Sequence, residues 1–262
     1  MKARLLILCS VLVMSCFAPP PELHAQYRDG AGSVDMHSCS DGEQERMTHE
    51  DVFRPVQLVA PAVLLGTGTA IHCFAHESLD YAVSDRFAAW RGTAPEIEAD
   101  DYVQYLPYAF VLGLGFLGSE ADHKFWERTV EVAFTAVSLV IVTRSMKHLI
   151  SSPRPNGADD HSFPSGHTAT AFAGAELVRM EYGPYWGAAA YTLATGVAFL
   201  RIYNRWHYLS DVIAGAGVGI LCAHIGEWLL PPVKRLFGPD VALAPTLDPV
   251  SGGVCVTLAM KF

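Results

Sequence analysis

The segment that decides this fold reads KHLISSPRP at residues 147–155, FPSGHT at 163–168 and RIYNRWHYLSD at 201–211. Each of the three polar clusters stands at the edge of an apolar stretch with a helix-like composition. The first contains a lysine and an arginine, the second is a Pro-Ser-Gly-His turn, and the third combines an arginine, a histidine and an aspartate. The clusters follow one another at the ends of consecutive predicted helices, so we expect them to meet on one side.

The apolar segments around these clusters predict an all-α, six-helix, membrane-embedded bundle. They are residues 56–75, 102–118, 125–146, 167–180, 184–200 and 212–230, and Pro231-Pro232 is expected to end the last one. Residues 76–101 mix aromatic side chains with many charges, which predicts short amphipathic helices at a membrane surface. Gly215, Gly217 and Gly219 predict close approach between helices. A tightly packed soluble helical bundle is the alternative.

Composition supports a single membrane domain. The chain has 262 residues, of which 51% are hydrophobic and only 17% are charged, so it is more apolar than an average soluble domain. Its mean hydropathy of +0.24 requires polar regions beside the apolar helices. The net charge of -9 argues against nucleic acid as a partner, because phosphate backbones require a basic surface. The sequence identifies no protein partner.

The two ends of the chain differ from its centre. Residues 1–25 have a basic start and an apolar stretch, which predicts a signal peptide that takes the protein out of the cytoplasm. A lipoprotein signal with lipidation at Cys16 is the alternative. Residues 26–54 form a polar leader, 55–235 the helical domain and 236–262 a tail whose alternating end predicts a short strand or hairpin.

The cysteines and carboxylates predict no metal or cofactor. The six cysteines show no metal-ligand spacing, and no disulfide is expected. Cys73 and Cys222 lie inside apolar segments, where we expect buried thiols. The carboxylates outside the three clusters form no ligand set along the sequence, so no metal is expected.

The first two clusters offer groups that bind an anion. Pro153 and Pro155 flank Arg154 and predict a shaped loop next to Lys147, although basic residues at a membrane interface are the alternative. Ser165 and Gly166 open a predicted helix, where backbone N–H groups point at an anion, and an ordinary N-cap turn is the alternative.

The histidines supply the reactive groups. His207 and Asp211 are four residues apart, so on a helix they share a face and the carboxylate can hold one ring nitrogen. His167 follows the helix start, where a structural histidine is the alternative. With Arg201, these clusters provide fixed positive charge, backbone donors, a nucleophile and a proton donor, which are the parts that phosphoryl transfer needs.

The motifs K-x6-R-P, P-S-G-H and R-x5-H-x3-D, in this order, resemble the signature of the type 2 phosphatidic acid phosphatase and vanadium haloperoxidase superfamily. The motifs cover residues 147–211, and the helix layout extends the resemblance to about 56–231. One departure is Leu200, because many members have serine before the arginine of the third motif. That difference puts one phosphate-side hydrogen bond and the subfamily in question.

The resemblance implies a metal-independent phosphatase with a phosphohistidine intermediate. His207 attacks phosphorus, Asp211 orients its ring, and His167 donates a proton to the leaving oxygen and then acts as a base toward water. The phosphate-binding residues that it implies are Lys147, Arg154, Ser165, Gly166 and Arg201.

The resemblance and the predicted membrane location imply an amphiphilic substrate. Phosphatidic acid, phosphatidylglycerol phosphate, undecaprenyl pyrophosphate and lipid A all fit, and the sequence does not rank them. We expect a bacterial inner-membrane protein whose site faces the periplasm, on the premise that the 56–75 run does not cross the bilayer. The alternatives are a soluble periplasmic acid phosphatase, a vanadium haloperoxidase and a non-catalytic phosphate-binding scaffold.

Overall fold

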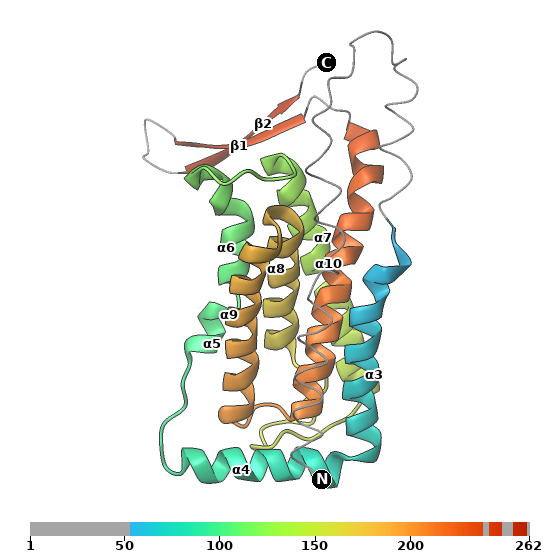
Figure 1. Ribbon diagram of the computed structural model, residues 1–262, viewed down its shortest axis with the longest axis vertical. Coiled ribbons are helices and arrows are strands. Elements are labelled where there is room, and N and C mark those ends of the chain that lie inside the picture. The colour runs from blue at the N-terminus through green and yellow to red at the C-terminus, as the bar shows by residue number, and fades with distance from the viewer. Residues whose placement is uncertain (1–52, 238–240, 248–253, 261–262) are drawn as a thin grey trace, which may run out of the picture. The chain divides into compact units, whose positions relative to one another are not determined.

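The computed structural model describes residues 53–237, 241–247 and 254–260. The expected signal peptide, nearly all of the polar leader, and Cys16 lie outside the described residues. The predicted helical fold is confirmed, because the described chain consists of helices followed by one hairpin (Figure 1). The hairpin pairs β1 (Val241–Leu247) antiparallel with β2 (Val254–Met260), as the alternating tail predicted.

The long helices agree with the predicted segments. They are α3 (Val59–Phe74), preceded by the 3-10 turn η1 (Pro55–Leu58), α7 (Phe125–Leu149), α8 (Gly166–Tyr182), α9 (Pro184–Tyr203) and α10 (Leu209–Phe237). Helix α8 packs against α9, α10 and α6 (Leu106–Gly113), and α10 packs against α3 and α7 as well. The buried core lies mainly on α8 and α10, and the glycines that predicted close approach between helices lie on α10.

Two glycines of α10 show how close this approach is. A methyl group added at Gly215 would lie 2.6 Å from the Ser165 carbonyl oxygen, and one at Gly217 would lie 2.8 Å from the Leu65 backbone nitrogen. Neither distance is possible for a real side chain, so α10 can pack against α3 and the start of α8 only with glycine at these positions.

Residues 76–118 depart from the prediction. A π-helical turn, η2 (His76–Asp80), leads into α4 (Tyr81–Arg91), which lies across the end of the bundle where α3 ends (Figure 1). The predicted helix at 102–118 is instead divided into α5 (Ala99–Val103), α6 and the 3-10 turn η3 (Leu114–Leu117). Pro107 lies in the first turn of α6, and because proline has no N–H to donate, a helix coming from α5 cannot continue through it unchanged.

The prediction that Pro231-Pro232 ends the last helix is wrong. Helix α10 continues through both prolines to Phe237. Proline removes an N–H donor but has a φ angle within the helical range, so near a helix end the backbone can continue in helical form. The expectation for Cys73 is also corrected, since Cys73 is exposed whereas Cys222 is buried as predicted.

Within the part of the chain that the structure describes, three helices are long and apolar enough to cross a membrane. These stretches are Pro55–Phe74, Phe125–Leu149 and Leu209–Leu236. Only 11% of the first and 17% of the second is buried within the protein, compared with 78% of the third, so α3 and α7 turn apolar surface outward. Pro61 lies in the first turn of α3, where proline is tolerated, so it does not interrupt this helix. The premise that this run is too weak to cross is therefore not supported.

Candidate active site

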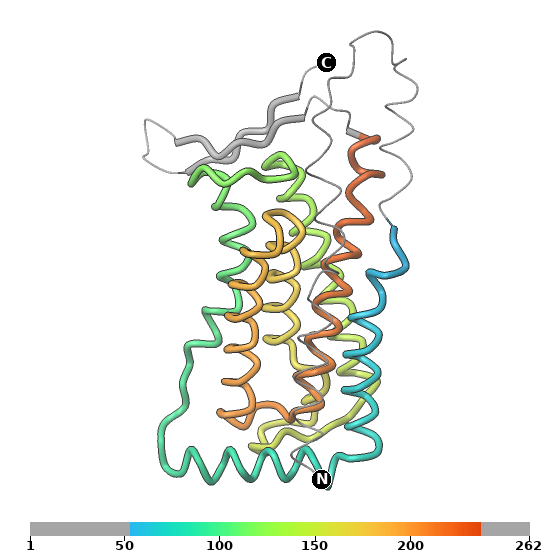
Figure 2. Tube along the Cα trace, viewed as in Figure 1, coloured from blue at the N-terminus to red at the C-terminus, as the bar shows by residue number. Residues whose placement is uncertain are grey.

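The three polar clusters meet at one end of the bundle. This end contains the C-terminus of α7, the first turn of α8, the C-terminus of α9 and the first turn of α10. Figure 2 follows the connection from α7 to α8 across this end. That connection forms a shaped loop, as the flanking prolines predicted. The Ser152 N–H donates to the Asp160 carbonyl at 2.9 Å, and the Arg154 N–H donates to the Asp159 carbonyl at 2.9 Å.

His207 and Asp211 lie side by side at the centre of the site. His207 is 2% exposed and Asp211 is fully buried, and Nδ1 of the histidine lies 3.5 Å from Oδ2 of the aspartate. Ser162 is a residue that the sequence did not indicate. Its hydroxyl donates to the same Oδ2 at 2.5 Å and lies 3.5 Å from the His207 Nδ1 atom. The partners of His207 thus gather on Nδ1, which leaves Nε2 for chemistry.

Burial also determines the charge of this imidazole. Removal from water lowers the pKa of His207 to about 4, against the opposing effect of the Asp211 carboxylate. The ring is therefore neutral at neutral pH, and a neutral ring has a lone pair available for attack.

Basic side chains from three elements lie near His207 or near its neighbour Trp206. Lys147, near the end of α7, donates to the His161 carbonyl at 2.5 Å. Arg154 pairs with Asp159 at 2.7 Å, and its guanidinium lies 5.2 Å from the Trp206 ring centroid. Arg201 lies 5.4 Å from the same ring. Trp206, which the sequence analysis did not single out, therefore positions both arginines through cation–π contacts.

Two acidic residues of α5 reach this site. Asp100 is fully buried and pairs with Arg201 at 2.6 Å. The Asp101 carboxylate lies 2.8 Å from Nε2 of His167 and 3.5 Å from the Arg201 guanidinium. Sequence reasoning missed both residues, because no motif links a carboxylate at 100 or 101 to a histidine at 167.

The Pro-Ser-Gly-His turn has the expected place but a different bonding pattern. Ser165 is the N-cap of α8, and its hydroxyl accepts the Thr168 hydroxyl at 3.0 Å and the Thr168 N–H at 3.5 Å. The Ser165 N–H donates to the Asp211 carbonyl at 3.0 Å. Ser165 is thus engaged within the protein, whereas the Gly166 N–H at the helix start has no partner among the described residues and is free to face an anion.

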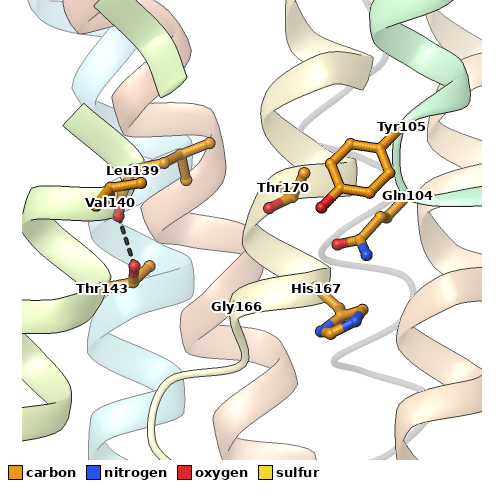
Figure 3. A pocket seen from close by; sticks show the side chains of 8 residues that line it. All are labelled: Gln104, Tyr105, Leu139, Val140, Thr143, Gly166, His167 and Thr170. Atoms are coloured by element: carbon orange, nitrogen blue, oxygen red, sulfur yellow. Dashed lines mark hydrogen bonds between the residues drawn. The ribbon is translucent and has the colours of Figure 1, made fainter. Parts of the chain in front are cut away.

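A pocket adjoins the histidine of this turn. It is lined by Gln104, Tyr105, Leu139, Val140, Thr143, Gly166, His167 and Thr170 (Figure 3). In Figure 3 the α7 side chains lie on one side and Gln104 and Tyr105 on the other, with the first turn of α8 between them. The pocket therefore joins His167 to a partly apolar wall of α7.

The structure corrects one premise of the sequence analysis. Among the described residues, carboxylates do gather with histidines in two groups of three, whose candidate ligand atoms lie within 4.8 Å of one another. The groups are His72 with His76 and Asp80, and His123 with Glu131 and Glu181. The residues of the second group are far apart in the sequence, so no spacing predicted that group. The residues of the first group lie at the end of α3 and in the turn after it.

Comparison with known proteins finds relatives over the part of the chain that contains the three motifs. Residues 128–232 match the PAP2 superfamily, and this range includes all eight residues predicted from the motifs. A lipid A 1-phosphatase of Porphyromonas gingivalis is 34% identical over 164 residues, which cover 60% of this chain and 37% of that protein. A PA-phosphatase related-family protein of Dictyostelium discoideum is 37% identical over 70 residues, or 27% of this chain and 12% of that protein. The chain thus spans well under half the length of either relative.

Two solved structures are also similar. The crystal structure of Aquifex aeolicus LpxE has 24% sequence identity and a TM-score of 0.41, and the match covers 54% of this chain and 92% of that one. A transmembrane PAP2-type phosphatidylglycerolphosphate phosphatase from Bacillus subtilis has 20% identity and a TM-score of 0.48, covering 70% and 98%. The residues that match the PAP2 superfamily enclose all three motifs, so the chain resembles this superfamily over the part that carries the candidate site.

Proposed function

We propose that this protein hydrolyses the phosphate ester or pyrophosphate of a membrane lipid through a phosphohistidine on His207. The observation that carries the proposal is the buried, neutral His207, whose Nδ1 faces Asp211 and which has the positive charges of Lys147 and Arg201 nearby. A nucleophile for phosphorus needs this combination of a fixed ring, a free lone pair and nearby positive charge.

In the first step, the Nε2 lone pair of His207 attacks phosphorus and the bond to the lipid oxygen breaks. Asp101, 2.8 Å from Nε2 of His167, orients the ring, and the protonated ring gives the proton of its other nitrogen, Nδ1, to that oxygen. Lys147, Arg154, Arg201 and the Gly166 N–H stabilise the charge on the phosphoryl oxygens, and the Ser165 hydroxyl caps the helix that presents this N–H.

In the second step, water attacks the phosphohistidine. His167, now neutral, accepts a proton from the water, and the bond between phosphorus and Nε2 breaks to release phosphate. Asp211 and Ser162 hold Nδ1 throughout, so the ring returns to its starting orientation. The residues of this cycle require no metal ion.

The active unit is proposed to be the helical domain at 55–235, which extends beyond the residues matched to the family. Asp100 and Asp101 lie outside residues 128–232, yet they pair with Arg201 and His167. Without α5, both of these basic residues would lose a counter-charge that they have in the described structure.

A lipid substrate follows from where the site lies. It is at one end of a bundle that turns the apolar surfaces of α3 and α7 outward, and the pocket beside His167 has Leu139 and Val140 of α7 in its wall. A head group can enter from the end of the bundle while the acyl chains remain along α7. Lipid A 1-phosphate is the first substrate to test, because the relative from P. gingivalis is a lipid A 1-phosphatase.

We further propose an inner-membrane location with the site facing the periplasm. Lys124, Lys234 and Arg235 lie near the other end of the bundle, at the start of α7 and the end of α10, which favours that end as cytoplasmic. Helix α3 has the length and composition of a membrane span. A cleaved signal peptide and a periplasmic site are compatible only if α3 does not cross the membrane. Labelling of Ala158→Cys, but not Glu120→Cys, by an impermeant maleimide in spheroplasts would support this orientation, and the opposite pattern would reverse it.

The activity is tested with the full chain purified in detergent. Phosphate release is measured from lipid A, phosphatidic acid, phosphatidylglycerol phosphate, undecaprenyl pyrophosphate and p-nitrophenyl phosphate, for the wild type, His207→Ala and His148→Ala, which alters an exposed histidine. We expect release from at least one lipid, lost only in His207→Ala. Activity on the soluble ester alone would identify an acid phosphatase, and no release from any substrate would favour a scaffold.

A further inference from the structure

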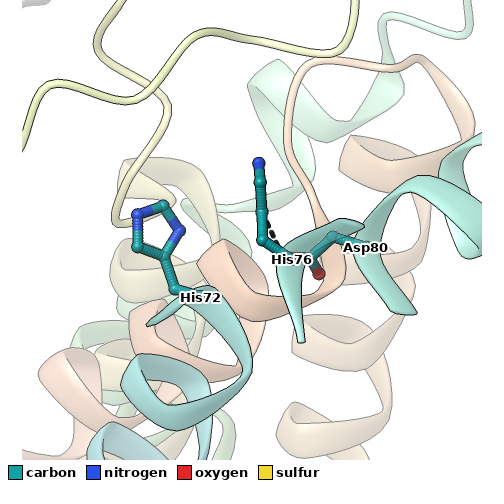
Figure 4. Close-up of side chains that lie close together, drawn as sticks. All are labelled: His72, His76 and Asp80. Carbon is teal, nitrogen blue, oxygen red and sulfur yellow. Dashed lines mark hydrogen bonds and ion pairs between the residues drawn. The ribbon is translucent and has the colours of Figure 1, made fainter. Parts of the chain in front are cut away.

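A group of side chains that could bind a metal ion lies at the end of α3 and in the turn that follows it. His72 is in the last turn of α3, and His76 and Asp80 begin and end the π-helical turn that follows. One donor atom from each lies within 4.8 Å of the other two. Figure 4 shows the two imidazole rings extending to the same side of the chain, with the Asp80 carboxylate at the base of His76.

The contacts of this group leave one nitrogen without a partner. Nδ1 of His72 is buried and has no hydrogen bond among the described residues. Nδ1 of His76 lies 2.8 Å from Oδ2 of Asp80, a distance that fits one shared proton. A buried imidazole nitrogen without a partner is costly, and it indicates a site for a ligand that would bind it.

The donor set selects a class of ion. Two imidazole nitrogens and one carboxylate oxygen suit zinc and neighbouring transition metals, whereas calcium and magnesium prefer oxygen ligands alone. Ligand bonds of about 2.0–2.2 Å in a tetrahedron separate two donor atoms by about 3.3 Å. The His76 nitrogen and the Asp80 oxygen would therefore move apart by only about half an ångström as the shared proton leaves.

The other group of three is a weaker candidate. Both oxygens of Glu181 accept from His123, at 2.7 Å from the backbone N–H and 2.9 Å from Nδ1, and both oxygens of Asp80 also accept hydrogen bonds, so the two groups differ in their neighbouring charge. Arg128 lies 3.8 Å from the same carboxylate. The nearby guanidinium opposes a second cation there, while no lysine or arginine is paired with His72, His76 or Asp80 in the described structure.

We propose that His72, His76 and Asp80 bind a divalent transition-metal ion of the zinc class, with water or an anion in the fourth position. The His76 side chain is 20% exposed, which leaves a path for the ion from the end of the bundle. The role of this ion is structural, because the ion is not a participant in the proposed phosphoryl transfer.

The position of the site gives the ion a defined effect. Asp80 accepts the Ser210 N–H at 2.9 Å and the Ser210 hydroxyl at 2.6 Å, and Ser210 precedes Asp211. The His72 ring lies 4.7 Å from that of Phe163, and the His76 ring lies 4.7 Å from that of Tyr208. Metal binding would therefore fix the end of α3 against the loop that precedes α8 and against the loop that carries His207.

The test is metal binding to the full-length protein in detergent after treatment with a chelator. Zn²⁺ is titrated by calorimetry, and Co²⁺ is added as a probe whose visible absorption reports its ligands. The substitution His72→Phe removes the ligand but keeps a ring against Phe163 and His76. We expect it to weaken binding at this site at least about 100-fold, since even the loss of outer-shell partners costs 10–100-fold.

Two controls separate this site from adventitious binding. His148→Phe makes the same change at an exposed histidine, and Cys73→Ser removes the exposed thiol next to His72. Both should retain the wild-type affinity and cobalt spectrum, and bound Zn²⁺ should raise the melting temperature of the wild type more than that of His72→Phe. The proposal is overturned if the wild type shows no saturable binding, or if His72→Phe binds as tightly as His148→Phe. These readouts do not depend on phosphatase activity.

Discussion

The Asp101 carboxylate lies 2.8 Å from Nε2 of His167, although the two residues belong to different helices and are 66 positions apart. Asp101 is exposed, and it also lies 3.5 Å from the Arg201 guanidinium. A carboxylate in this place stabilises the protonated form of the imidazole and balances part of the positive charge that would bind phosphate. It is thus placed to influence both substrate binding and proton transfer.

Replacement of Asp101 by asparagine should therefore change the pH profile. The imidazolium of His167 loses its counter-charge, so the alkaline fall in kcat should move to lower pH, while KM for an anionic substrate should decrease. Because the contact is partly exposed, we expect changes of about 3-fold to 10-fold, corresponding to on the order of 1 kcal/mol. The measurement is kcat and KM from pH 5 to 9, with Glu98→Gln as a nearby charge control. An unchanged alkaline limb would mean that Asp101 does not act through His167.

Replacement of Ser162 by alanine should lower kcat more than it changes KM. The hydroxyl is buried and donates to Asp211 at 2.5 Å, so its loss leaves the Asp211–His207 pair less constrained. We expect a decrease of about 10-fold to 100-fold, since a 1 Å misplacement costs on the order of 100-fold. The free energy of unfolding should decrease by about 1–3 kcal/mol, because the buried Asp211 carboxylate loses a hydrogen-bond donor. Ser151→Ala, at an exposed neighbour, should leave both quantities unchanged, and an equal effect there would contradict this role.

The pH dependence of stability should carry the signature of His207. Burial lowers its pKa to about 4 in the folded protein, from about 6.5 in an unfolded chain. Between these values the unfolded state binds the additional proton, so the free energy of unfolding decreases as the pH falls from about 6.5 through about 4. Above pH 6.5 this contribution is fully present.

The check is the melting temperature of wild type and His207→Gln from pH 3.5 to 7.5. The wild type should lose more stability than the variant across the interval from pH 6.5 to 4. Phosphoenzyme formation should persist below pH 6, because the nucleophile is still neutral there. Parallel melting curves for the two proteins would show that His207 does not titrate in this way.

Replacement of Gly219 by alanine should destabilise the bundle. A methyl group there would overlap the Ala169 carbonyl and lie 2.9 Å from the Ala173 nitrogen, so α8 and α10 would have to separate. Overpacking of this kind costs about 1–3 kcal/mol. The matched control is Gly196→Ala in α9, where nothing lies within 4 Å and the helix should gain up to about 1 kcal/mol. Thermal unfolding in detergent compares them, and equal melting temperatures would disprove the close contact.

The sequence by itself determined the long helices and the eight motif residues of the candidate site. Apolar runs of membrane-spanning length predict helices with little dependence on their neighbours, because the length and composition of a segment are local properties. The four-residue spacing of His207 and Asp211 likewise predicts that they meet, and the structure brings them together. A prediction from local sequence was wrong at Pro231 and Pro232, because α10 continues through both prolines.

Only the tertiary structure decided which residues support those of the motifs. Ser162, Asp101 and Trp206 reach the site through the path of the loops and the placement of α5, which no periodicity encodes. The group of His72, His76 and Asp80 depends on a π-helical turn that brings Asp80 to Ser210 from 130 positions away. The physical reason is that a contact between distant segments depends on how the helices pack, whereas a helix depends mainly on the residues within it.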